Sequence, residues 1–131
     1  MKKILIITTL LFFAASCNRA SEPQLEQIAL TFLTSYFSLD FEQTLSLCGK
    51  VLKTDLEQSA KTIGGLSQGT QDKLRDELSV YSFQIDKADL NSAKDSVFVS
   101  YTVFTPEAPE GVPSHLTMAK EENEWKVVKL L

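Results

Sequence analysis

The hydrophobic pattern of this chain changes its period once, near Ser79, and this change limits the folds that the chain can adopt. Before Ser79, apolar residues recur every three or four positions, which is typical of amphipathic helices. After Ser79, apolar and polar residues alternate, which is typical of strands with one buried face. Helices followed by hairpin-linked strands predict an α+β domain.

The first two helices carry recognisable start signals. Ser21 to Gln24 has the pattern of a capping box, with Pro23 in the first turn, and the apolar stripe behind it is too broad for an exposed helix. We therefore expect a sheet to cover this long helix. Asp40 is expected to cap a second, short helix that ends at Gly49.

The remaining elements follow from apolar spacing. A third helix is expected over residues 51–63, and Thr70 is expected to cap a fourth helix. The expected strand cores are Val80–Ile85, Val97–Phe104, Ser114–Ala119 and Trp125–Leu130. Two of their links are short, whereas Pro106–Pro113 is expected to be a longer, mobile hairpin loop. Short links favour an antiparallel meander, so we expect a curved four-stranded sheet wrapped around the first helix.

The N-terminal residues have the order of a secretion signal. Lys2 and Lys3 precede an uncharged apolar run over residues 4–15, which is shorter than the about 20 residues that cross a bilayer. The sequence Ala14-Ala15-Ser16-Cys17 resembles the lipobox of bacterial lipoproteins, although that box usually opens with Leu. In such proteins the cysteine receives lipid and the signal is cut before it. The alternative is an ordinary secretory signal with an incidental cysteine.

This interpretation divides the chain into a signal peptide (1–16), a lipidated tether (17–21) and one domain (22–131). Acyl chains on Cys17 would supply the two membrane signals that stable anchoring needs. Asn18 is not the Asp that resembles an inner-membrane retention signal. We therefore expect a cell-envelope protein, anchored in the outer membrane and facing the periplasm.

The charge of the mature chain disfavours two classes of partner. Of the 13 basic residues, Lys2 and Lys3 leave with the signal, so 11 remain against 17 acidic residues and the net charge is −6. Nucleic acid requires clustered Lys and Arg, so no nucleic-acid partner is expected. The negative charge also opposes adsorption to anionic lipids, so the lipid on Cys17 must carry the membrane attachment.

Cysteine and histidine content argues against a disulfide or a metal centre. If Cys17 is modified, Cys48 is the one thiol left, and we expect a small buried residue near a helix end. A redox or dimer-linking role for Cys48 is the alternative. One His and one free Cys do not make a zinc site, and no cofactor is expected.

Three segments carry a resemblance to a known fold family: residues 36–42, 95–99 and 123–128. They resemble the cone-shaped, cystatin-like fold of nuclear transport factor 2 and ketosteroid isomerase, as found in small lipoproteins of Gram-negative bacteria. The resemblance implies a hollow at the wide end of the cone and frequent homodimers, which we would place on the sheet face. It implies no activity, because this fold carries enzymes and binding modules alike.

The sequence does not provide an obvious catalytic acid or base for such a hollow. None of the four expected strand cores contains Asp or Glu, and Asp40 fits a helix cap better than a base, so no catalytic residue is assigned. His115 alternates with Leu116 and Met118, so it is expected on the outer face of the sheet. The candidate residues for a ligand pocket are Tyr36, Tyr81, Tyr101 and His115.

Two functions therefore remain open. The first is a lipid-anchored, non-enzymatic module that binds a small apolar ligand or a protein partner. The second is a cone-fold enzyme, of isomerase or dehydratase type, that acts on a small hydrophobic substrate. A hollow that holds His115 beside a tyrosine would favour the enzyme. In either case Trp125, at the start of the last strand, is expected to be fully buried.

Overall fold

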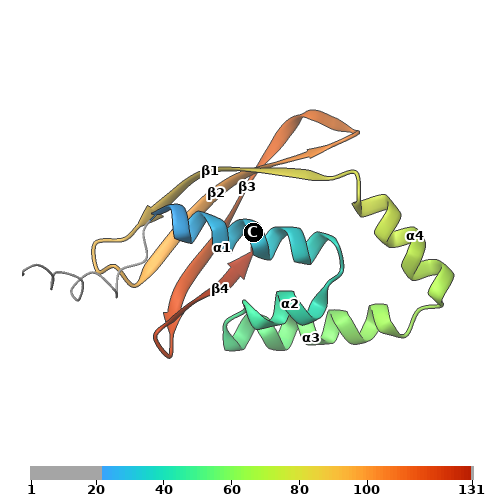
Figure 1. Cartoon of the computed structure of the whole chain (residues 1–131), viewed down its shortest axis with the longest axis horizontal. Helices are drawn as coiled ribbons and strands as arrows, with labels where there is room; N and C mark the ends of the chain where they lie inside the picture. The colour runs from blue at the N-terminus through green and yellow to red at the C-terminus, as the bar shows by residue number, and fades with distance from the viewer. Residues whose placement is uncertain (1–21, 131) are drawn as a thin grey trace, which may run out of the picture.

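The computed structural model describes residues 22–130, so Ser21, Cys17 and the signal lie outside the described residues. Four helices precede four strands (Figure 1). The helices are α1 (Glu22–Phe37), α2 (Phe41–Ser46), α3 (Lys50–Gly64) and α4 (Gln68–Leu78). The strands are β1 (Ser82–Leu90), β2 (Ser96–Thr105), β3 (Ala108–Glu121) and β4 (Glu124–Leu130). The predicted α+β class is confirmed. None of the described helices is long and apolar enough to cross a membrane.

The strands form one antiparallel sheet in the order β1-β2-β3-β4, which is the predicted meander. Val99 lies opposite Leu116, and Met118 lies opposite Val127, so alternate residues of three strands gather on one face. α1 lies across this face of the sheet (Figure 1). The alternation that predicted the strands therefore also selects the face that α1 covers.

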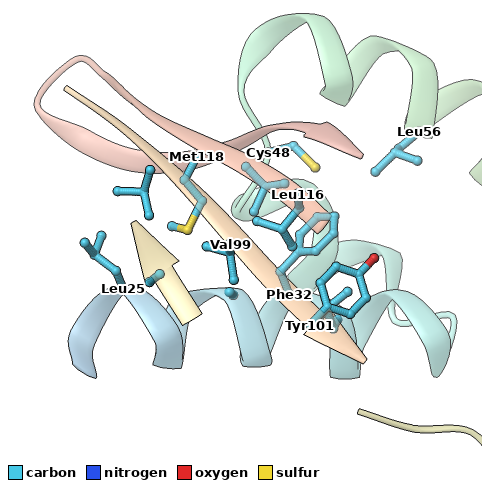
Figure 2. Packing of buried hydrophobic residues seen from close by; sticks show 13 residues of the cluster. Leu25, Phe32, Cys48, Leu56, Val99, Tyr101, Leu116 and Met118 are labelled. Atoms are coloured by element: carbon cyan, nitrogen blue, oxygen red, sulfur yellow. The ribbon is translucent and has the colours of Figure 1, made fainter. Parts of the chain in front are cut away.

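The space between α1 and the sheet is filled. Phe32 and Leu33 from α1 and Leu116 and Met118 from β3 have no exposed surface, and Figure 2 shows this cluster. Burial of side chains of this size contributes about 1.5–3 kcal/mol each. The space between α1 and the buried face of the sheet is therefore packed with side chains.

The edge of the sheet at β4 is covered by the segment that joins α2 to α3. The Gly49 N–H donates to the Val127 carbonyl, and the Val127 N–H donates to the Leu47 carbonyl, each at 2.8 Å. Cys48, between these partners, is 6% exposed. The pairing satisfies backbone groups that an open edge strand would leave free.

A carboxylate from the sheet caps α3. The N-cap residue Gly49 offers no side chain, and Glu121 Oε1 accepts the Lys50 N–H at 3.0 Å from 71 residues away. A Cβ atom on Gly49 would lie 2.5 Å from Glu121 Oε2 and 2.8 Å from Val128 Cγ1. A larger residue at this position would therefore have to displace the Glu121 carboxylate and the Val128 side chain.

The predicted loop over residues 106–113 is wrong, because β3 begins within it at Ala108. Pairing between β3 and β4 ends at Leu116, so Pro109 and Pro113 lie where β3 has no β4 neighbour. Proline has no N–H to donate, and on a side of β3 that faces no strand this loss removes no hydrogen bond of the sheet. The two prolines therefore mark the part of β3 that has no β4 neighbour. The turn between β2 and β3 is short.

Two helix caps test the predicted starts. Asp40 caps α2 as predicted, since its side chain accepts the Gln43 N–H. The prediction for α4 is wrong: Ser67 is the cap, and its hydroxyl accepts the Thr70 N–H at 3.2 Å. Ser67 and Thr70 both favour the N-cap position, and serine ranks above threonine there.

The strands extend beyond the expected strand cores, which themselves hold no Asp or Glu, and the added residues include carboxylates. β1 continues to Leu90 past an irregularity between Ile85 and Lys87, which places Asp86 within a strand. Asp86 is exposed and accepts a hydrogen bond from the Thr102 hydroxyl at 2.7 Å. The remaining strand carboxylates are Asp89, Glu110, Glu121 and Glu124, of which none is buried.

Candidate functional site

The candidate site begins at the C-terminal end of α1, where aromatic rings pass from the core to the surface. Phe37 lies 5.1 Å from the Tyr36 ring, 5.7 Å from Tyr81 and 4.7 Å from Phe83, measured between ring centroids. Tyr36 in turn stacks on the buried Phe32 at 5.9 Å. The rings are thus positioned by the core on one side, and the far side of Phe37 remains available for contacts.

An apolar hollow of about 310 Å³ lies beside this aromatic cluster. Its wall is built from the end of α1, the start of α2, and both α3 and α4. The lining residues are Tyr36, Phe37, Leu39, Phe41, Ser59, Ile63, Leu74 and Leu78. We call this space the apolar hollow. Its size reaches the lower end of the range for small-molecule pockets, and no charged side chain lines it.

A second hollow, of about 380 Å³, lies next to the first and shares Phe37 and Leu78 with it. Its lining includes aromatic rings, hydroxyl groups and two charged side chains. The remaining lining residues are Thr34, Ser38, Arg75, Asp76, Ser79, Tyr81 and Phe83. We call this space the mixed hollow.

Helix α4 borders both hollows but packs little. It has no buried residue, although Leu74 and Leu78 form an apolar pair one turn apart. In Figure 1, α4 joins the end of α3 to the start of β1, away from the starting end of α1. An apolar helix face that no core covers can contribute its binding energy to a ligand.

The four residues proposed for a pocket do not come together. Tyr36 lines the apolar hollow and Tyr81 lines the mixed hollow. Tyr101 lines neither, because it is 5% exposed within the core. Burial raises the pKa of Tyr101, Tyr36 acts in the same direction, and a hydrogen bond with Ser114 acts against them. Tyr101 is therefore a core residue with a satisfied hydroxyl.

His115 lies on the outer face of the sheet, as its alternation with Leu116 predicted. Its ring is half-buried against the ring of Phe98, with 4.6 Å between the centroids. Phe98 itself is 43% exposed. His115 is thus not paired with a tyrosine in either hollow, and the predicted homodimer through this face stays a prediction.

Cys48 is a buried free thiol, as predicted. Its Sγ donates to the Thr44 carbonyl at 3.2 Å, and burial raises the pKa of the thiol to about 11. Lys126 and Lys53 oppose this shift without reversing it. A thiol that remains protonated is a poor nucleophile, so burial and the raised pKa fit a packing role for Cys48.

Sequence reasoning missed most of the hollow's residues. Phe41 belongs to a segment that carries the fold resemblance, Ile63, Leu74 and Leu78 fit the helical apolar spacing, and nothing in the sequence assigns them or Arg75 to a site. One signal could have identified them: α4 is short and polar, yet it repeats leucine at an interval of four residues. Such a helix contributes little to a core, so its apolar pair is a candidate for ligand contact.

The comparisons with known proteins found one similar solved structure. No protein-family model matches the sequence, and no curated protein matches it. One similar solved structure is described as a "Putative NTF2-like transpeptidase" from Campylobacter jejuni. It is 20% identical, with a TM-score of 0.48, and the match covers 80% of this chain and 97% of that one. The helices followed by an antiparallel meander agree with the nuclear transport factor 2-like fold that the sequence resemblance implied.

Proposed function

We propose that this protein is a lipid-anchored, non-enzymatic module of the cell envelope that binds a small apolar ligand in the apolar hollow. The observation that carries the proposal is the composition of that hollow, whose walls are apolar side chains from four helices with hydroxyls as the polar groups. Ligand pockets in proteins combine such apolar walls with a few polar groups. Neither His nor Cys lines it, and its Tyr36 hydroxyl lacks a basic partner there.

The apolar hollow lies at the C-terminal end of α1, whereas Cys17 precedes the start of this helix in the sequence. The helix starts at Glu22, five positions after Cys17, and ends at Phe37 in the hollow. Its 16 residues span about 24 Å at the usual helical rise. A lipid on Cys17 would therefore hold the far end of the domain at the membrane and leave the hollow facing the aqueous phase.

Binding is tested with N-phenyl-1-naphthylamine, an uncharged apolar fluorophore that brightens when it leaves water. The full chain should bind the probe, and Leu74→Gln should weaken binding about tenfold, because a leucine contact contributes about 1.5 kcal/mol. Leu66→Gln is the matched control, since Leu66 is 40% exposed and lines neither hollow. Equal affinity in the two variants would contradict the proposed site.

Anchoring is tested separately by Cys17→Ser. The unmodified chain should sediment with membranes and carry the mass of acyl groups at Cys17, and the variant should lose both properties. Unchanged fractionation of Cys17→Ser, together with an unmodified N-terminal mass in the parent chain, would contradict the anchor and leave the ligand site intact.

A further inference from the structure

The two hollows meet at a shared wall formed by Phe37 and Leu78. One hollow is lined almost wholly by apolar side chains, whereas the other is lined by aromatic, hydroxyl and charged side chains. A ligand that extends past Leu78 and occupies both hollows would place one part among apolar side chains and another part among polar groups. This arrangement suits an amphipathic ligand better than a wholly apolar one.

Arg75 is the one basic residue that lines either hollow. Its Nη1 lies 3.6 Å from Asp72 Oδ1, and both side chains are well exposed, at 45% and 61%. An ion pair that is long and exposed is weak, so a ligand can replace it at little cost. A guanidinium offers paired N–H donors that match the two oxygens of a carboxylate.

Asp76 limits the charge that the mixed hollow can accept. It lines the same hollow as Arg75, its neighbour on α4. Its negative charge repels an anion and repels a doubly charged one more strongly. The pair therefore favours a single negative charge, as on a carboxylate, over the double charge of a phosphate monoester.

We infer that the ligand is an amphipathic carboxylate, with its apolar chain in the apolar hollow and its head group on Arg75. This inference rests on the proposed function, since it names the class of ligand for the same site. Phe37 and Leu78 would contact the chain where it crosses from one hollow to the other. Arg75 would then be a specificity residue, and the apolar walls would supply affinity.

The test compares decanoate with decanol, which share a chain and differ in the charge of the head. Both probes are titrated calorimetrically, at concentrations below self-association, into the full chain carrying Cys17→Ser, so that no acyl group of the protein competes. Decanoate should bind about tenfold more tightly than decanol, the factor expected for one charge-assisted contact at a partly exposed site. Arg75→Gln should reduce decanoate affinity to that of decanol and leave decanol unchanged.

Two further variants complete the design. Asp76→Asn should strengthen decanoate binding by roughly threefold, because it removes a nearby negative charge. Leu74→Gln should weaken both probes, and Leu66→Gln should weaken neither. Circular dichroism is used to check that each variant keeps its helices.

The outcomes separate the two proposals. Loss of the decanoate preference in Arg75→Gln, with decanol unaffected, supports the inference. Equal binding of the two probes, with and without Arg75 but with both weakened by Leu74→Gln, overturns the inference and leaves the proposed function standing. Binding that Leu74→Gln does not change, or no binding of either probe, overturns both.

Discussion

Replacing Glu121 with alanine would remove the cap that joins the sheet to α3. Glu121 Oε1 accepts the Lys50 N–H at 3.0 Å, and the N-cap residue Gly49 has no side chain to replace it. Loss of an N-cap acceptor costs about 0.5–2 kcal/mol, and the carboxylate also interacts favourably with the helix dipole. We therefore expect Glu121→Ala to lower the free energy of unfolding by about 1–2 kcal/mol.

A loss of that size lowers the melting temperature of a domain of this length by roughly 4–10 °C, which thermal unfolding followed by circular dichroism resolves. Amide hydrogen exchange gives a second readout, because the Lys50 N–H should exchange faster once its acceptor is gone. Loss of the cap should also loosen the wall of the apolar hollow, because Ser59 and Ile63 of that wall belong to α3.

Glu122→Ala is the matched control. Glu122 lies 3.6 Å from Lys50 Nζ, and both side chains are 82% exposed, so this ion pair should contribute little. Melting temperatures that fall equally in Glu121→Ala and Glu122→Ala would show that general charge, and not the cap, stabilises α3. An unchanged exchange rate at Lys50 in Glu121→Ala would refute the cap directly.

The remaining predictions concern four side chains that line neither hollow. Trp125 is half-buried, short of the full burial expected from its position, so Trp125→Ala should cost about 2–3 kcal/mol in thermal unfolding, below the 3–5 typical of full burial. Its indole N–H is buried without a hydrogen-bond partner among the described residues, so Trp125→Phe should lose much less; equal losses would contradict this. Cys48 should resist Ellman's reagent at neutral pH until the chain is unfolded. Folding raises the pKa of the Cys48 thiol from 9.0 to about 11. The stabilisation that the protonated thiol contributes to the fold is therefore complete below pH 9.0 and is lost as the pH rises through 11. The free energy of unfolding of Cys48→Ala, measured against pH, should lack this decrease at high pH. His115→Ala should change the free energy of unfolding by no more than about 1 kcal/mol, because it removes a contact with an exposed ring, whereas Met118→Ala should cost about 2–5 kcal/mol.

Local patterns were enough to predict the class of the fold and the faces of its strands. The change of period near Ser79 separates helices from strands, and the alternation around Leu116 places His115 on the outer face. Both features depend on residues a few positions apart, whose relative directions are fixed by helix and strand geometry. Boundaries were less well predicted where two capping residues compete or where proline stands on an unpaired side of a strand.

Contacts between distant segments could not be predicted in this way. The Glu121 cap joins residues 71 positions apart, and Val127 pairs with the segment around Cys48. The apolar hollow takes its walls from four helices, and Arg75 of α4 lines the mixed hollow together with Phe37 of α1. Periodicity shows that a helix has an apolar face, but it does not show whether another element covers that face. Packing settles this question, because α1 and all four strands fill the core and leave the leucines of α4 beside an open space.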